Sequence, residues 1–385
     1  MRSSNFIHAV TQFNYPTKIV FGAGALERLT DEMSLLKMSR PLAVTDRGLV
    51  QTPVFSRVMD VIRKKFPDAV VFKETLPNPT EQNVLDGVSE YHSSRCDGIV
   101  GIGGGSALDT AKAVTLKATH QLPLADYDDL KDGSTLITSN LPPLIAVPTT
   151  SGTGSDVSRS TVITIAATNR KTVIFSPFLM PKVSVSDPEL TVGMPFQITA
   201  GTGMDAFTHN LEAYLAKGYH PLCDAIALGG VKLVWEYLPQ ALGNPRDLEA
   251  RTQVMAAAIM GATAFQKGLG AVHSLAHPLS TIAGMHHGTS NAVLLPAVMR
   301  FNAAVVPERL EDLAVAMGAD RNVDAAIQRV LELNRVSKIG TLKDYGVTGN
   351  MIEPMTDKAM EDGCRLCNPR ELSRSQMQQL YEESM

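Results

Sequence analysis

Five of the nine histidines of this chain lie in the apolar stretch Gly270 to Pro278 or in two short stretches upstream and downstream of it. Within it His273 and His277 stand four residues apart, and upstream Asp205 and His209 are also four residues apart. Side chains four residues apart on a helix leave the same face, so the two members of each pair can point at one place. Buried imidazoles and carboxylates are costly unless something compensates them, and a bound divalent metal is the simplest compensation.

Three imidazoles and one carboxylate suit a borderline divalent ion such as iron(II) or zinc. One buried histidine alone is more often a hydrogen-bonded core residue, but two such pairs among apolar neighbours favour a metal site. The downstream turn His286-His287-Gly288 adds two further candidates. The residues alone therefore offer six candidate ligands for about four positions. Spacing does not choose among them, because His277 shares a helix face with His273.

Size and composition exclude several classes of protein. A chain of 385 residues is longer than one core usually supports, so we expect two domains. A net charge of -4 gives no electrostatic case for nucleic acid or an anionic membrane as a partner. The sequence has neither an apolar run of about 18 residues nor the apolar core of a signal peptide, so we expect a cytoplasmic location.

The four cysteines include one closely spaced pair, Cys364-x-x-Cys367. A zinc knuckle needs a second pair of this kind, and the sequence contains none. We therefore expect free thiols in a reducing compartment.

The two halves of the chain show different periodicities. The first half alternates short β-branched runs with amphipathic stretches, which is typical of a parallel sheet covered by helices. From about residue 191 the strand pattern ends, and long apolar-periodic segments follow at 196–215, 223–242 and 248–266. We therefore predict an N-terminal Rossmann-like α/β domain over residues 1–190 and an all-helical metal-binding domain over residues 191–385.

Glycines follow one of the predicted strands at the position where open α/β sheets bind ligands. The apolar run 97–102 leads into Gly103, Gly104 and Gly105, and a predicted helix follows from Ser106. Free backbone N–H groups and the helix dipole at such a turn favour phosphate, which we prefer over a turn without a ligand. A second loop rich in hydroxyl groups and glycine, Thr149 to Ser155, follows another predicted strand at the same edge.

In combination these motifs resemble the iron-containing (group III) alcohol dehydrogenases, a family that includes lactaldehyde reductase and 1,3-propanediol dehydrogenase. The motifs are Gly103-Gly104-Gly105-Ser106-x-x-Asp109-x-x-Lys112, Gly203-Met204-Asp205-Ala206-x-Thr208-His209, and Gly270-x-x-His273-x-x-Ala276-His277 followed by His287-Gly288. The resemblance covers nearly the whole chain and implies a dehydroquinate synthase-like fold.

The resemblance also implies roles for individual residues. It implies Asp205, His209, His273 and His287 as ligands of iron, with zinc as the alternative metal, and leaves His277 beside the metal as a proton-relay group. It places Asp109, as a catalytic residue, near the nicotinamide end of bound NAD. The residues that it places along NAD are Asp46, Asn78, Gly103, Gly104, Gly105, Ser106, Thr149, Thr150, Thr153 and Lys171.

The acid at the adenosine ribose decides which dinucleotide is favoured. A carboxylate accepts hydrogen bonds from the ribose 2′-hydroxyl and repels a 2′-phosphate, so Asp46 would favour NAD over NADP. A standard dinucleotide fingerprint would instead place the acid about twenty residues after the glycines, near Asp126. The surroundings of Asp126 predict a solvated turn, and we follow the family in preferring Asp46.

The expected activity is reversible hydride transfer between NAD(H) and a short-chain alcohol or diol, with an aldehyde or ketone as the product. The resemblance implies a homodimer or larger homo-oligomer and a small-molecule partner. The alternatives on the same fold are an NAD-using transhydrogenase and a sugar-phosphate cyclase, which is a lyase. A cyclase needs clustered Lys and Arg for a phosphorylated substrate, and Lys217, Lys232 and Lys267 do not cluster near the histidines in the sequence.

Overall fold

The computed structural model describes residues 11–15, 17–168 and 170–385. The described residues form two compact units, one within the range 16–194 and the other made of 195–385 together with the N-terminal segment 11–15. In that segment Asn14 N donates to Gln266 Oε1 at 2.7 Å, so its backbone is tied to the second unit. The predicted range 1–190 had instead placed these residues in the first unit. Local sequence pattern does not indicate a contact to a residue as distant in sequence as Gln266.

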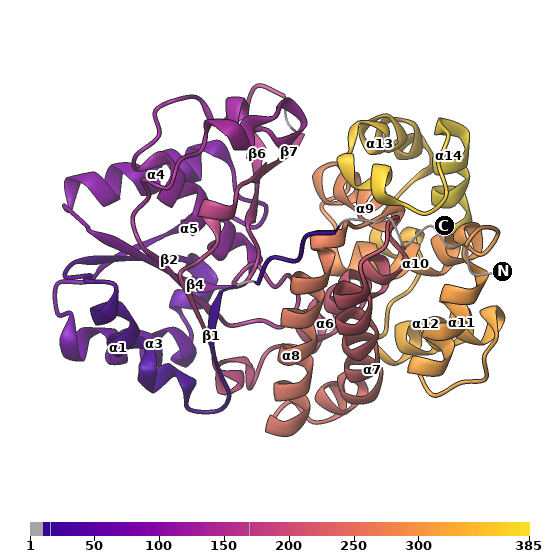
Figure 1. Cartoon of the computed structure of the whole chain (residues 1–385), viewed down its shortest axis with the longest axis horizontal. Helices are drawn as coiled ribbons and strands as arrows, with labels where there is room; N and C mark the ends of the chain where they lie inside the picture. Colours follow the sequence, from indigo (N-terminus) through magenta and orange to yellow (C-terminus); the bar gives the residue numbers. More distant parts are fainter. Residues whose placement is uncertain (1–10, 16, 169) are drawn as a thin grey trace. The chain divides into compact units, whose positions relative to one another are not determined.

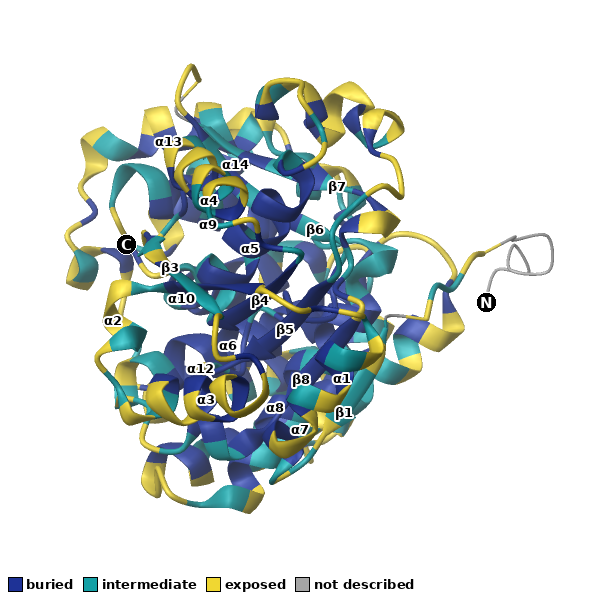
Figure 2. Ribbon diagram, turned by 90° about the vertical axis from the view of Figure 1, so that its left-hand side faces the viewer, coloured by how far each residue is buried: buried dark blue, intermediate teal, exposed yellow. Residues whose placement is uncertain are grey.

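The first unit is built on a six-stranded sheet in the order β1-β8-β5-β4-β2-β3, with every pairing parallel. The strands are β1 (Lys18–Phe21), β2 (Pro41–Asp46), β3 (Val70–Thr75), β4 (Gly98–Gly103), β5 (Leu144–Pro148) and β8 (Val183–Ser186). Strands β4, β5 and β8 are buried along their whole length (Figure 2), as expected for a sheet covered on both faces.

Helices cover both faces of this sheet. Helices α1 and α3 pack on one face and α4 and α5 on the other (Figure 1). The helices of this unit are α1 (Leu29–Leu35), α2 (Arg47–Val50), α3 (Pro53–Lys65), α4 (Glu81–Ser93) and α5 (Gly105–Lys117). An antiparallel hairpin, β6 (Ser160–Ile165) and β7 (Arg170–Phe175), forms a second small sheet. The predicted parallel-sheet architecture is therefore confirmed.

The second unit contains helices joined by loops and no strand among the residues that the structure describes. Its helices are α6 (Phe196–Leu215), α7 (Pro221–Gly243), α8 (Leu248–Ala264), α9 (Ala271–Ile282), α10 (His287–Asn302), α11 (Pro307–Ala316), α12 (Val323–Val336), α13 (Gly349–Glu361) and α14 (Arg374–Glu383). Helix α6 is buried from Thr199 to its end and forms the centre of the unit. Among the described helices, none is both long and apolar enough to cross a membrane.

Candidate metal and cofactor sites

Four side chains from three helices of the second unit converge on one point. Asp205 and His209 come from α6, His273 from α9 and His287 from the first residue of α10. Each offers one ligand atom, and these atoms all lie within 4.8 Å of one another. Oδ1 of Asp205 is 3.8 Å from Nε2 of His209 and 3.6 Å from Nε2 of His287. One carboxylate and three imidazole nitrogens at this spacing fit a four-coordinate divalent ion.

The start of α10 lies at this point because its backbone packs very closely against the backbone of α6. A Cβ atom at Gly288 would lie 1.9 Å from the carbonyl oxygen of Gly201 on α6 and 2.9 Å from Cβ of Asp205. Only glycine leaves room for that approach. The glycine therefore brings its neighbour His287 beside Asp205.

A buried glutamate that the sequence analysis missed, Glu212, holds one of the candidate ligands. Nδ1 of His273 donates to Oε2 of Glu212 at 2.6 Å, which leaves Nε2 of the imidazole for a metal. Burial opposes protonation of His273, but Glu212 outweighs it and raises the pKa of the imidazole. Glu212 follows His209 by three residues on α6, so helical spacing was the signal that could have found it.

The same carboxylate caps α9. Its oxygens accept hydrogen bonds from the backbone N–H groups of Gly270 and Val272 at 3.0 and 2.7 Å. Helix α9 has no side-chain cap at Gly270, so these N–H groups would otherwise lack partners in a buried position. A negative charge is also favourable at the positive end of a helix dipole.

Asn291 is a second polar side chain at this point that the sequence analysis missed. Its Nδ2 donates to Oδ1 of Asp205 at 2.9 Å and lies 3.4 Å from Nε2 of both His273 and His287. Asn291 is four residues after His287 on α10, so it leaves the same helix face. This hydrogen bond restrains the Asp205 carboxylate, while Oδ1 of Asn291 has no hydrogen-bond partner among the described residues.

His277 lies on α9 and outside the four-residue cluster. Its ring stacks on that of His287 with the centroids 5.3 Å apart, and its Nδ1 donates to Oδ2 of Asp362 at 2.7 Å. His277, Asp362 and Cys364 form a separate group of potential ligands. The remaining candidate, His286, is exposed and belongs to neither group. The structure thus distinguishes among the six candidate metal ligands, which their spacing in the sequence did not.

In the first unit the glycine turn and the hydroxyl-rich loop pack against each other. Gly103 ends β4 with φ of 145°, a conformation that favours glycine, and its carbonyl oxygen accepts from Thr149 N at 3.0 Å. A Cβ atom at Gly105 would lie 2.6 Å from Cγ2 of Thr153. The start of α5 therefore presents backbone N–H groups beside threonine hydroxyls, an arrangement that suits a diphosphate.

Asp46 ends β2, the neighbour of β4 in the sheet. Its Oδ1 accepts from Leu49 N at 2.8 Å and caps α2, while Oδ2 would lie 3.7 Å from a Cβ atom at Gly103. The carboxylate is therefore beside the glycine turn. Asp126, the alternative acid, is exposed in a short 3-10 helix, Leu124–Tyr127.

The other expected cofactor contacts also belong to the first unit. Asn78 adopts a left-handed conformation with φ of 59°, which asparagine tolerates better than most residues. Lys171 lies in β7 opposite Thr164 of β6, and Thr164 N donates to the carbonyl oxygen of Pro79. The hairpin is thus fastened to the loop that carries Asn78.

The carboxylate of Asp109 is engaged within the first unit. Its oxygens accept from Oγ of Ser155 at 2.6 Å and from Val162 N at 3.1 Å. Burial raises its pKa although these hydrogen bonds and Lys112 oppose the shift. Asp109 is thus a fixed anchor for the segment that follows the hydroxyl-rich loop.

Lys112 is a fully buried cation beneath the same segment. Its Nζ donates to Oγ of Ser155 and Ser158, each at 2.9 Å, and to the carbonyl oxygen of Ser160 at 2.8 Å. Burial lowers its pKa to about 8, although Asp109 opposes the shift. The three bonds hold the chain between β5 and β6 against α5.

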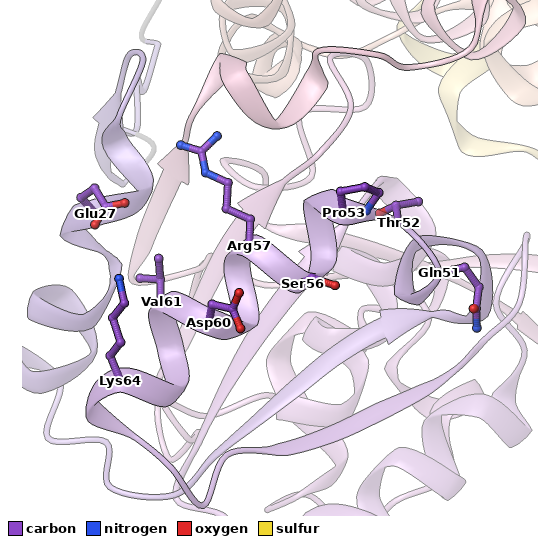
Figure 3. Close-up of a pocket in the computed structure, with 9 residues that line it drawn as sticks. All are labelled: Glu27, Gln51, Thr52, Pro53, Ser56, Arg57, Asp60, Val61 and Lys64. Carbon is purple, nitrogen blue, oxygen red and sulfur yellow. The ribbon is translucent and has the colours of Figure 1, made fainter.

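An open groove elsewhere on the first unit does not coincide with these residues. It is lined by residues that include Gln51, Thr52, Ser56, Arg57, Asp60 and Lys64 (Figure 3). Both signs of charge are present, and Arg57 already pairs with Glu189 at 2.5 Å. None of the expected cofactor contacts lines this groove.

Replacing Glu212 by Gln tests its role in holding His273. The change keeps the side-chain shape but removes the charge that orients the imidazole and caps α9, so affinity for a divalent metal should fall about 10- to 100-fold. Competition with a chromophoric chelator measures this affinity. The control is Glu236→Gln at an exposed position on α7, which should leave affinity unchanged. Equal affinity in the two folded variants would contradict the role of Glu212.

Comparison with protein families identifies both units. The family profile described as "Iron-containing alcohol dehydrogenase" matches residues 16–188. The profile described as "Fe-containing alcohol dehydrogenase family, C-terminal" matches residues 199–385. Together they cover almost the whole chain, and the predicted resemblance is confirmed.

Characterised relatives match over their full length. The chain is 42% identical to 4-hydroxybutyrate dehydrogenase of Cupriavidus necator, over 96% of this chain and 99% of that protein. It is 36% identical to 1,3-propanediol dehydrogenase of Klebsiella pneumoniae, over 97% and 98%. It is 34% identical to NAD-dependent methanol dehydrogenase of Bacillus methanolicus, over 98% and 100%.

Solved structures agree with these relatives. A crystal structure of 1,3-propanediol oxidoreductase superposes with a TM-score of 0.92 at 35% identity, covering 97% of this chain and all of the other. Sulfoacetaldehyde reductase from Bifidobacterium kashiwanohense, in complex with NAD+, superposes with a TM-score of 0.89 at 28% identity, covering 98% and 99%. The chain therefore belongs to the iron-containing alcohol dehydrogenase family, whose members are oxidoreductases that act on alcohols.

Proposed function

We propose that this enzyme reversibly oxidises a short-chain alcohol or diol with NAD, using a divalent metal held by Asp205, His209, His273 and His287. The metal is iron(II), with zinc as the alternative. The observation that carries the proposal is the convergence of these four ligand atoms within 4.8 Å in an apolar helical unit. Three of these four side chains are buried, and a divalent cation would offset part of the cost of burying a carboxylate and imidazoles at one place.

A divalent ion held by these four ligands would keep a net positive charge. One carboxylate and three neutral imidazoles cancel only one of the two positive charges of a divalent cation. Such a cation supplies Lewis-acid chemistry, because it stabilises the negative charge that develops on the alcohol oxygen during oxidation. Glu212 and Asn291 keep the ligands in place for that task.

His277 moves the proton. Oxidation of an alcohol releases one proton and one hydride, and the nicotinamide of NAD is the hydride acceptor. Because Nδ1 of His277 donates to Asp362, its Nε2 is the atom that takes the proton from the alcohol. Asp362 orients the ring and stabilises the imidazolium, and in the reverse direction His277 returns the proton to the carbonyl oxygen.

The glycine turn and its neighbours bind NAD. The N–H groups of Gly104, Gly105 and Ser106 face the diphosphate at the start of α5, with the hydroxyls of Thr149, Thr150 and Thr153 beside them. Asp46 accepts from the ribose hydroxyls, while Asn78 and Lys171 contact the cofactor from the hairpin side. Asp109 contributes to catalysis through the segment it anchors, near the nicotinamide.

The substrate class follows from the chemistry in the relatives' names. 4-Hydroxybutyrate and 1,3-propanediol are both short chains with a primary hydroxyl at one end and a second polar group at the other. We propose a substrate of this kind, converted to the corresponding aldehyde.

The alternative activities are less well supported. A sugar-phosphate cyclase needs free cations near the metal, yet Lys267 is buried and bonded to Asp224 at 2.6 Å. A transhydrogenase would share every feature of the two sites and differ only in retaining its cofactor. Retention of NAD through gel filtration would distinguish it.

The proposal includes a homodimer or larger homo-oligomer in the cytoplasm. Strand β1 has one described neighbour in the sheet, β8, so its other edge remains open for pairing. All four cysteines are free, which suits a reducing compartment.

Two variants test the metal and proton roles separately. Protein stripped of metal and refilled anaerobically with iron(II) or zinc should reduce NAD with short diols. His273→Ala should retain no metal and show no turnover. His277→Ala should retain the metal and lose about 100- to 10,000-fold in kcat, the usual contribution of a general base. Turnover by metal-free His273→Ala, or loss of metal in His277→Ala, would contradict the assignment.

The preference for NAD is tested at Asp46. Asp46→Asn keeps the cap on α2 but removes the charge that repels a 2′-phosphate. The ratio of kcat/KM for NAD to that for NADP should fall by about 10-fold or more, since one such charge contact is worth about 1.4 kcal/mol. Asp126→Asn is the matched control and should leave the ratio unchanged. The opposite result, a change only in the control, would assign the ribose to Asp126.

A further inference from the structure

Beside the four-residue cluster lies a second group of potential ligands with different chemistry. His277 projects from α9, Asp362 follows α13, and Cys364 lies in the short 3-10 helix Gly363–Cys367. One ligand atom of each lies within 4.8 Å of the others, and all three residues are half-buried. The group therefore combines an imidazole, a carboxylate and a thiol at a place that solvent can reach.

We propose that His277, Asp362 and Cys364 form a second cation site, selective for zinc and other thiophilic divalent ions. Its occupation would withdraw His277 from proton transfer and so inhibit the enzyme. The binding is independent of the proposed function, whereas the inhibition rests on the proposed role of His277.

The geometry of the group is close to what such an ion requires. In a tetrahedral zinc site with bonds of 2.0–2.3 Å, donor atoms are about 3.3 to 3.8 Å apart. Nδ1 of His277 and Oδ2 of Asp362 are 2.7 Å apart and need only separate slightly when the proton between them leaves. The other carboxylate oxygen, Oδ1, is already held by Oγ of Ser274 at 2.8 Å and by Cys364 N at 2.9 Å. The carboxylate is thus oriented with Oδ2 toward the candidate site.

The charges balance for a divalent ion. One carboxylate, one thiolate and one neutral imidazole cancel both positive charges, in contrast to the net positive charge left at the four-residue cluster. Desolvation raises the pKa of the Cys364 thiol well above its usual range, so without a metal the sulfur is protonated. Binding of the ion releases the proton of the Cys364 thiol. When Nδ1 of the neutral His277 imidazole binds the ion, the proton of the ring is carried by Nε2 instead. Water completes the coordination from the solvent side.

The sulfur donor distinguishes the two sites. The four-residue cluster offers only nitrogen and oxygen, whereas a thiolate favours zinc over iron(II) and magnesium. Cys364 is a free thiol, as expected, and the proposal gives that thiol a role as a metal ligand.

Cobalt(II) provides the test, because a thiolate ligand gives it an intense charge-transfer absorption that imidazole and carboxylate do not give. Metal-free protein titrated anaerobically with cobalt(II) should bind two ions per chain, and one of them should produce the thiolate band. Cys364→Ser should lose the band and bind one ion. Cys367→Ser, three residues away in the same 3-10 helix, is the matched control and should keep both.

His273→Ala separates this proposal from the proposed function. This variant should no longer bind the cobalt ion that gives no thiolate band, but it should still bind the ion that gives the band. That result would show that the two sites are distinct. In the wild-type enzyme loaded with iron, added zinc should suppress turnover without releasing iron, and Cys364→Ser should be at least 10-fold less sensitive. Absence of the thiolate band at saturating cobalt(II), or its persistence in Cys364→Ser, would overturn the proposal.

Discussion

The carboxylate of Glu212 joins the two helices on which the candidate metal centre is built. From α6 it accepts both the first backbone N–H groups of α9 and the Nδ1 proton of His273. Those N–H groups would otherwise be unpaired in a buried position, so the capping bond and the bond that orients the ligand depend on the same charge. Any change that displaces α9 from α6 therefore also displaces His273.

Each unit accommodates polar groups in its interior by giving them several partners at once. Helix α6 carries Asp205, His209 and Glu212 in its buried part. Glu212 and His209 contact His273 on α9, and Asp205 contacts His287 and Asn291 on α10. In the first unit Lys112 does the same for the segment between β5 and β6 with three hydrogen bonds. Low surrounding polarity strengthens these interactions and makes a missing partner costly. These polar groups therefore maintain the geometry of the candidate metal and cofactor sites.

Local pattern was sufficient for most of the fold. The predicted segment 196–215 coincides with α6, and the predicted strand before Gly103 leads into α5 as expected. The segment His286-His287-Gly288 was predicted as a turn, but α10 already begins at His287. Glycine is a poor helix former, and its role at Gly288 is to permit close contact with α6.

Contacts distant in sequence could not be predicted in this way. Glu212 and His273 are 61 residues apart, and His277 and Asp362 are 85 residues apart, so only the packed helices bring them together. The attachment of Asn14 to Gln266 is of the same kind. The family resemblance named four ligands among the candidates, but the groups that orient them became apparent only from tertiary structure.

X-ray absorption at the iron edge of protein loaded with one equivalent of iron(II) tests the central claim most directly. The first shell should consist of nitrogen and oxygen at about 2.0–2.2 Å, with scattering from three imidazole rings and no sulfur. In Asp205→Ala the oxygen contribution and most of the bound iron should be lost. A sulfur scatterer in the first shell, or fewer than three imidazoles, would contradict the assignment of iron to Asp205, His209, His273 and His287.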